Sequence, residues 1–243
     1  PGCGLWEDDR NGLDEAVQAA EKAEVAILVL GGTSMVKAGT GWGTEQRVAT
    51  CGEGFDRMEL TPPGVQEELA RAVCGTGTPV VLVLMHGRPY GIEWLAEHAA
   101  AILETWYPGQ EGGHALADVL FGKVNPSGKL PVSVPRSVGN SPAFYNYKPS
   151  ARGYYHRPGS PEEPGRDYVF APPTPLWEFG HALSYTDFEY SELGLSPDEI
   201  APAGRTEVSV KVTNTGDRPG KEVVPLYIRD RFSSTTTPVR ALR

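Results

Sequence analysis

The chain of 243 residues carries 22 basic and 31 acidic side chains, a formal net charge of −9, and no run of basic residues. This balance argues against a nucleic acid or an anionic membrane as a partner. A content of 40% hydrophobic and 22% charged residues is typical of one or two globular domains with a buried core. The longest apolar runs, such as 80–85, are too short to cross a bilayer, and the first residues lack a signal-peptide pattern.

The first half of the chain alternates patterns typical of helices with patterns typical of strands. Helices are expected over 11–22, from Pro63 onward, over 92–98 and over 115–121. Strands are expected over 25–30, 80–85, 100–105 and 130–134. The run 80–85 is apolar throughout, which favours a parallel sheet covered on both faces. The sequence therefore predicts a layered α/β sandwich with a mostly parallel sheet.

Three loops follow the ends of predicted strands, at 31–62, 86–89 and 106–110. Ligands of parallel sheets gather beyond the carboxyl ends of the strands, so we expect these loops to share one rim. The loop 31–62 has no convincing periodicity, and a loop of that length is usually either functional or disordered. We interpret it as functional.

The composition changes after Pro135. Residues 136–175 are rich in Pro, Gly, Tyr and Arg, which we interpret as an ordered connector. Alternating patterns over 207–213 and 224–228, with a turn signal at 214–217, predict the start of an antiparallel β-sandwich. These strands are too few to close two sheets, so we expect the native polypeptide to continue.

The three cysteines, Cys3, Cys51 and Cys74, match no zinc-binding spacing. Buried or free thiols are the first interpretation, and a Cys3–Cys51 bridge or a metal role stays open. The glycine-rich stretch 39–43 lacks the spacing of a dinucleotide site and does not lie directly between a strand and a helix. No serine-hydrolase elbow or zinc-protease motif occurs in the sequence.

Several motifs together resemble the second half of glycoside hydrolase family three enzymes, the β-glucosidases and β-xylosidases. The first group surrounds the long loop and comprises Gly52-Glu53-Gly54-Phe55-Asp56-Arg57, Leu60 and Pro63-Gly64. The second group comprises Trp106 to Gly113, Ala117 to Gly122 and Asn125 to Pro131. The third group comprises Pro175-Leu176, Phe179-Gly180-His181 and Leu183 to Thr186. There are two departures: Ala182 stands where the motif usually has Gly, and 39–51 resembles an extended lead-in to the loop.

The resemblance implies an order of domains, with a (β/α)8-type barrel first, an α/β sandwich second and a fibronectin type III-like domain third. On that basis we assign 1–135 to the α/β sandwich domain, whose N-terminal edge is missing. We assign 136–190 to the connector and 191–243 to a partial fibronectin type III-like domain.

The resemblance also implies the chemistry of the site. In the family an Asp of the barrel is the nucleophile, and a Glu on a loop of the sandwich domain is the general acid/base. Glu53 matches that Glu, and Glu45 of the same loop is the runner-up. Retaining hydrolysis needs two carboxyl groups about 5–5.5 Å apart, so only half of the catalytic pair lies in this sequence. Without the resemblance, a Gly-Glu-Gly triplet is usually a solvated turn.

Other side chains near the loop have two interpretations each. Trp42 and Phe55 either stack on a sugar ring or pack in a core. Arg57 either contacts sugar hydroxyl groups or, with Asp56, forms an intraloop ion pair or anchor. The rim residues His86 and Arg88 and four aromatic residues are expected to be structural, the latter being Trp106, Tyr107, Trp177 and Tyr185.

The leading hypothesis is a retaining, exo-acting β-glycosidase, a β-glucosidase first and a β-xylosidase second, with neither metal nor cofactor. The expected partners are β-linked glucosides or short oligosaccharides and an N-terminal barrel of the same enzyme, and the fragment alone is expected to be inactive. The resemblance favours a secreted or periplasmic protein. A non-catalytic carbohydrate-binding or interaction module and a nucleotide- or flavin-binding domain are the alternatives, and the oligomeric state stays open.

Overall fold

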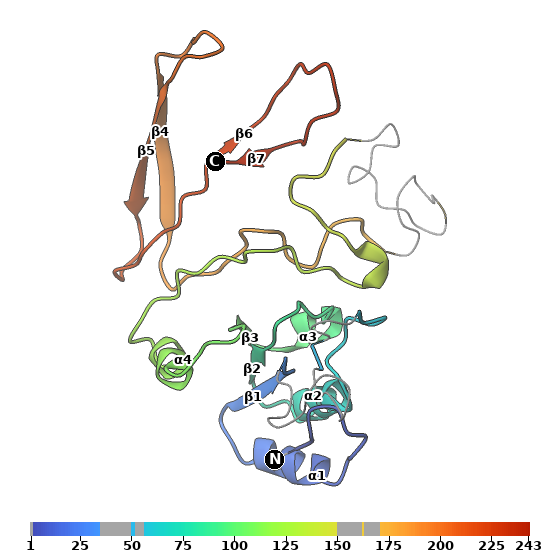
Figure 1. Ribbon diagram of the computed structural model, residues 1–243. Coiled ribbons are helices and arrows are strands. Elements are labelled where there is room, and N and C mark those ends of the chain that lie inside the picture. The colour runs from blue at the N-terminus through green and yellow to red at the C-terminus, as the bar shows by residue number, and fades with distance from the viewer. Residues whose placement is uncertain (1, 35–49, 52–55, 150–161, 163–170) are drawn as a thin grey trace.

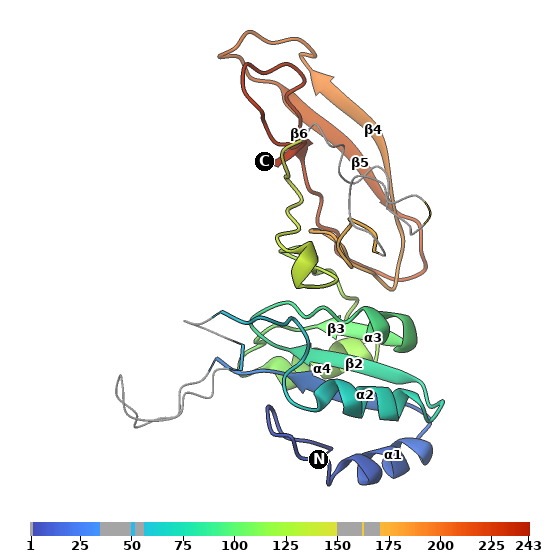
Figure 2. The same cartoon turned by 90° about the vertical axis from the view of Figure 1, so that its right-hand side faces the viewer.

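The computed structural model describes residues 2–34, 50–51, 56–149, 162 and 171–243. The N-terminal half forms an α/β body, and the C-terminal part forms two short antiparallel sheets some distance from it (Figures 1 and 2). Two extended segments connect these parts and run side by side, linked by backbone hydrogen bonds such as the one from Val134 N–H to Trp177 O at 2.8 Å.

The α/β body is built on a parallel sheet with the strand order β1-β2-β3. Strand β1 (Ala26–Gly31) pairs with β2 (Val80–Met85), which pairs in turn with β3 (Ala101–Glu104). The central strand β2 is buried along most of its length, as its uniformly apolar sequence predicts. The predicted parallel sheet is therefore confirmed.

Helices lie on both sides of this sheet. One face packs against α1 (Leu13–Glu21), α2 (Gln66–Cys74) and α3 (Glu93–His98), while α4 (Gly112–Leu120) lies on the other side (Figure 1). The core between the first three helices and the sheet contains Leu30, Leu69, Val73, Leu82, Leu84 and Leu95. Burial of each such side chain contributes about 1.5–3 kcal/mol. Among the described helices, none has the length and apolar character that a membrane span requires.

The predicted strand over 130–134 is wrong. This segment is extended and lies against 176–181, but it forms only one isolated bridge, between Val134 and Trp177. Pro131 and Pro135 have no backbone N–H to donate, so a continuous ladder cannot form. A 3₁₀ turn, η1 (Val138–Asn140), follows.

The C-terminal part contains two antiparallel pairs. Strand β4 (Phe188–Ser196) pairs with β5 (Glu207–Asn214), and β6 (Tyr227–Ile228) pairs with β7 (Ala241–Leu242). The strand expected over 207–213 is confirmed, whereas the one expected over 224–228 is shorter because Pro225 interrupts it. Strand β4 escaped prediction because the irregularity between Ser191 and Gly194 breaks its alternation.

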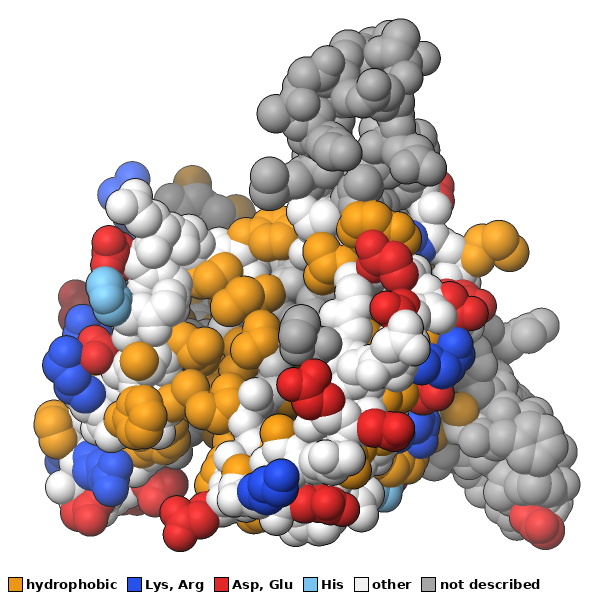
Figure 3. Space-filling model, turned by 90° about the horizontal axis from the view of Figure 1, so that it is seen from below, with side chains coloured by type: hydrophobic (Ala, Val, Ile, Leu, Met, Phe, Trp, Pro, Cys, Tyr) orange, Lys and Arg blue, Asp and Glu red, His pale blue; other side chains and the backbone are white. Residues whose placement is uncertain are grey.

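The edge strand β1 exposes apolar side chains on the face away from the core. Ile27 and Val29 of this strand, and Val25 just before it, are each about half exposed. Figure 3 shows hydrophobic side chains gathered on the surface seen from the side of α1 and β1. A missing N-terminal edge of the α/β domain stays a prediction.

Candidate active site

The carboxyl ends of the three parallel strands meet around a hollow of about 510 Å³. Its lining comes from all three loops and comprises Ser34, Cys51, His86, Gly87, Arg88, Trp106 and Tyr107. The expectation that the loops after the three strands share one rim is therefore confirmed for the described residues. Four of the proposed site residues, Glu53, Glu45, Trp42 and Phe55, lie outside the described residues.

The two described ends of the long loop are joined by hydrogen bonds. The backbone N–H of Thr33 donates to Thr50 Oγ1 at 2.8 Å, and the N–H of Cys51 donates to the carbonyl oxygen of Thr33 at 3.2 Å. The chain therefore returns to the end of β1 before it continues to Glu53, two residues after Cys51.

The sulfur of Cys51 is buried and accepts two hydrogen bonds. One comes from the backbone N–H of Gly87 at 3.3 Å and the other from the hydroxyl group of Tyr107 at 2.9 Å. Ser34 Oγ in turn donates to the Tyr107 hydroxyl at 2.9 Å. Partial burial, followed by the bond to Cys51, raises the pKa of Tyr107, which keeps its hydroxyl group protonated as a donor.

A buried imidazole–carboxylate pair lies beside this cluster. Nε2 of His86 lies 2.7 Å from Oε2 of Glu104, and the two side chains are 0% and 10% exposed. The contact has the length of an ion pair but does not have the angles of a hydrogen bond. Both ring nitrogens of His86 and both carboxylate oxygens of Glu104 therefore have no hydrogen-bond partner among the described residues. The rings of Tyr90 and Trp106 pack against His86. His86 also lines the hollow, and its ring nitrogens have no hydrogen-bond partner among the described residues, so it is not the satisfied residue that was expected. A purely structural role for it stays a prediction.

Arg57 anchors the part of the chain that follows Glu53 in the sequence. Its Nη2 donates to the carbonyl oxygen of Thr61 at 2.8 Å, and its guanidinium carbon lies 5.9 Å from the centre of the buried Tyr90 ring. Burial raises the pKa of the Tyr90 hydroxyl group. These contacts fit the anchor interpretation of Arg57, and a sugar contact stays a prediction.

The four aromatic residues expected to be structural divide into two groups. Trp177 packs against the core, and Trp106 contacts the His86 ring. Tyr107 and Tyr185 are 49% and 43% exposed and use their hydroxyl groups as donors, Tyr185 to the carbonyl oxygen of Val119. Tyr107 and Tyr185 are therefore not only packing residues, because each also donates a hydrogen bond.

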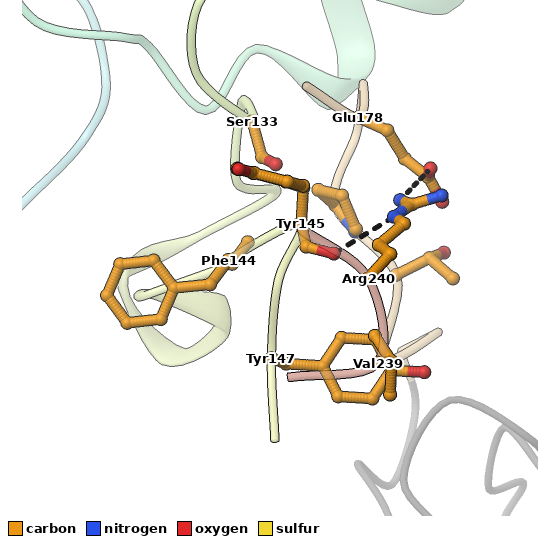
Figure 4. A pocket seen from close by; sticks show the side chains of 10 residues that line it. Ser133, Phe144, Tyr145, Tyr147, Glu178, Val239 and Arg240 are labelled. Carbon is orange, nitrogen blue, oxygen red and sulfur yellow. Dashed lines mark hydrogen bonds and ion pairs between the residues drawn. The ribbon is translucent and has the colours of Figure 1, made fainter. Parts of the chain in front are cut away.

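A second hollow, of about 380 Å³, lies between the connector and the C-terminal segment. In it Arg240 donates to Glu178 Oε2 and to the carbonyl oxygen of Tyr145, both at 3.1 Å (Figure 4). Val239 N–H donates to the carbonyl oxygen of Tyr147 nearby. These bonds hold the C-terminal segment against the connector.

All three cysteines are free thiols, so the alternative Cys3–Cys51 bridge does not form in the structure. Burial raises the pKa of both Cys3 and Cys74. In the part of the chain that the structure describes, no cluster of His, Cys, Asp and Glu is arranged to hold a metal ion.

Sequence reasoning missed Glu104 and the role of Cys51. An acidic residue at the end of the apolar strand 100–105 was a signal for the first. The hydrogen bonds of Cys51 have no sequence signal, because their partners lie 36 and 56 residues away.

Comparison with known proteins gives a consistent result. Residues 8–185 match the family described as glycosyl hydrolase family 3 C-terminal domain. A β-xylosidase from Formosa agariphila is 41% identical over 100% of this chain and 30% of its own length. A periplasmic β-glucosidase from Salmonella typhimurium is 42% identical over 95% of this chain and 28% of its own length.

Among solved structures, a β-glucosidase from Listeria innocua in complex with laminaribiose aligns with a TM-score of 0.81 at 33% identity. The alignment covers 99% of this chain and 31% of that protein. The chain thus spans about a third or less of the length of these relatives.

Proposed function

Because this chain belongs to the family of glycosyl hydrolase family 3 C-terminal domains, we propose that it is the acid/base-bearing part of a longer, retaining β-glucosidase. Support for the activity comes from relatives named β-glucosidase and β-xylosidase, which match the chain over nearly all of its length. The Listeria innocua protein in complex with laminaribiose supports β-linked glucosides or short oligosaccharides as substrates.

The observation that carries the proposal is the position of Cys51. This residue lies at the carboxyl edge of the parallel sheet, beside the hollow, and precedes Glu53 by two residues. Ligands of parallel sheets bind at this edge. The acid/base candidate that the family motif identifies is therefore attached to the part of the fold where a substrate is expected.

In the proposed mechanism, Glu53 protonates the glycosidic oxygen as the bond to the departing group breaks. An aspartate on a barrel domain, elsewhere in the enzyme, attacks the anomeric carbon and forms a glycosyl-enzyme intermediate. Glu53 then takes a proton from the water that hydrolyses this intermediate. The two roles require a carboxyl group that is first protonated and then ionised, within hydrogen-bond reach of the reacting oxygen.

The test is Glu53→Gln in the full-length enzyme, assayed with aryl β-glucosides of graded leaving-group pKa. We expect kcat/KM to fall by about 10²- to 10⁴-fold for poor leaving groups and much less for activated ones. Azide should restore part of the turnover of activated substrates. Glu45→Gln is the matched control from the same loop and should behave as the wild type. An equal loss across the substrate series would show that Glu53 does not donate the proton.

A β-xylosidase is the second candidate, because the Formosa agariphila relative with that name is 41% identical to this chain. The ratio of kcat/KM for aryl β-glucosides and aryl β-xylosides in the full-length enzyme distinguishes the two.

The remaining parts of the proposal concern the rest of the enzyme. The division of this chain at residues 135 and 190, the barrel partner and the inactivity of the fragment alone all belong to it. An exo-acting mode and a secreted or periplasmic location also belong to the proposal. The name of the Salmonella typhimurium relative, a periplasmic β-glucosidase, supports the location. Turnover by the purified 243-residue chain would contradict it.

A further inference from the structure

We propose that Cys51 and Tyr107 form a positioning pair that fixes the segment carrying Glu53 at the rim of the sheet, an inference that rests on the function proposed above. Neither residue donates the catalytic proton. Cys51 acts through its place in the chain, two residues before Glu53, and Tyr107 acts by holding the Cys51 sulfur.

Cys51 is the residue at which all three loops of the rim meet. Its N–H donates to Thr33 O, which follows β1. Its sulfur accepts from the N–H of Gly87, which follows β2, and from the hydroxyl group of Tyr107, which follows β3. A residue held from three strand ends has a fixed place relative to the whole sheet.

The surroundings of Cys51 leave it little room to move. A Cβ atom at Gly32 would lie 2.7 Å from the Tyr90 hydroxyl oxygen, 2.8 Å from Thr50 Oγ1 and 2.9 Å from the Cys51 sulfur. Only glycine allows the backbone just after β1 to approach these three groups so closely. Cys51 itself is 3% exposed.

The segment after Cys51 is short and is held again at its other end. Residues 52–55 separate Cys51 from Asp56, and the next residue, Arg57, donates to the carbonyl oxygen of Thr61 at 2.8 Å. Two residues of fully extended chain span at most about 7 Å, so the position of Cys51 limits how far Glu53 can lie from the rim.

Proton transfer depends on where the carboxyl group of Glu53 lies. A general acid works only within hydrogen-bond reach of the departing oxygen, and a misplacement of about 1 Å can cost about 10²-fold in rate. A hydroxyl group that fixes the base of the acid's segment therefore contributes to proton transfer without touching the substrate.

The test uses Tyr107→Phe and Cys51→Ala in the full-length enzyme with the same aryl glucoside series. Each variant should lower kcat/KM for poor leaving groups by about 3- to 10-fold and leave activated substrates within about twofold of the wild type. Cys51→Ser, which keeps an acceptor, should recover part of the loss. The double variant should be no worse than the more impaired single one, because the two residues act as a unit.

Tyr185→Phe is the control for Tyr107→Phe, since it removes a hydroxyl group bonded to a backbone carbonyl oxygen at 3.0 Å away from the rim. Cys74→Ala, in a half-buried site at the end of α2, is the control for Cys51→Ala. Neither control should alter the dependence on leaving-group pKa. If Cys51→Ala does not fold, Tyr107→Phe decides, because it preserves the shape of the ring.

An unchanged leaving-group dependence in Tyr107→Phe and Cys51→Ala overturns the positioning pair, provided that Glu53→Gln steepens it. A Glu53→Gln variant with an equal loss for all substrates overturns the proposed function instead. The Glu53 variant thus tests the function, and the other two test the inference.

Discussion

The side chain of Gln66 binds both backbone polar groups of Gly31. Its Oε1 accepts from the Gly31 N–H and its Nε2 donates to the Gly31 carbonyl oxygen, both at 2.8 Å, and the same nitrogen donates to Leu5 O at 2.9 Å. Gln66 begins helix α2 and is 2% exposed. One amide therefore completes the hydrogen bonding at the end of the edge strand β1.

Gln66→Leu should destabilise this end of the sheet by about 2–4 kcal/mol, because it leaves the Gly31 N–H and C=O buried without partners. Hydrogen exchange at the Gly31 amide in the full-length enzyme measures the effect, which should be a marked acceleration. Gln18→Leu, at an exposed position of α1, is the control and should leave that exchange rate unchanged.

Two glycines of the α/β body should respond in opposite directions to alanine. A Cβ at Gly31 would lie 1.8 Å from the carbonyl oxygen of Met85, its partner in the register of β1 and β2, so Gly31→Ala should cost at least about 3 kcal/mol. A Cβ at Gly113 meets nothing within 4 Å, so Gly113→Ala in helix α4 should stabilise by up to about 1 kcal/mol. Thermal unfolding of the full-length variants measures both, and equal effects would contradict the packing described for Gly31.

Removing one member of the His86–Glu104 pair should be costly. Glu104→Gln removes the carboxylate that lies against the buried His86 ring and should destabilise by about 1–3 kcal/mol. The partly exposed pair of Arg136 and Glu93 provides the control, and Glu93→Gln should change stability by less than about 1 kcal/mol. A double variant, His86→Phe with Glu104→Leu, should be less destabilised than Glu104→Gln in chemical unfolding. If it is more destabilised, the pair itself is stabilising.

A pH-dependent contact links Lys129, in the segment that precedes the connector, to the C-terminal part. Lys129 Nζ lies 2.8 Å from Glu222 Oε1, and the Tyr190 hydroxyl group donates to the same oxygen at 2.7 Å. The hydrogen bond from Lys129, followed by that from Tyr190, lowers the pKa of Glu222 from 4.5. Burial, followed by the bond to Glu222, raises the pKa of Tyr190 to about 12, so its hydroxyl group remains a donor throughout.

Because the folded-state pKa of Glu222 is lowered, its contribution to stability is present above pH 4.5 and is lost as the pH falls through the lowered value. Glu222→Gln should therefore cost on the order of 1 kcal/mol at pH 7 and progressively less below pH 4.5. The gap between wild-type and variant melting temperatures at pH 7 and pH 3 measures this. Glu192→Gln, which breaks an exposed pair with Lys211, should show no such change.

The elements of the α/β body could be predicted because its periodicity is strong. The helical stripe of α2 and the apolar run of β2 each report a buried face directly. Prediction failed where backbone chemistry overrode the pattern, at 130–134, where two prolines remove donors, and at β4, where Glu192 has a φ of 54°.

The site was predictable in outline only. The ends of predicted parallel strands place the three loops on one rim, because strand direction decides which loops are neighbours. The contacts of Cys51 with Tyr107 and of His86 with Glu104 depend on distances between segments, which periodicity does not contain. The catalytic assignment of Glu53 rests on its motif and stays a prediction.

The hydrogen bonds between Thr33 and the Thr50–Cys51 end close the long loop at its base. Closing a flexible loop costs only about 0.6 kcal/mol more for each doubling of its length. A change in the number of residues between these two ends should therefore cost little stability. Segments of other lengths, grafted from relatives between Ser34 and Thr50, can therefore be tried without rebuilding the contacts that hold Cys51.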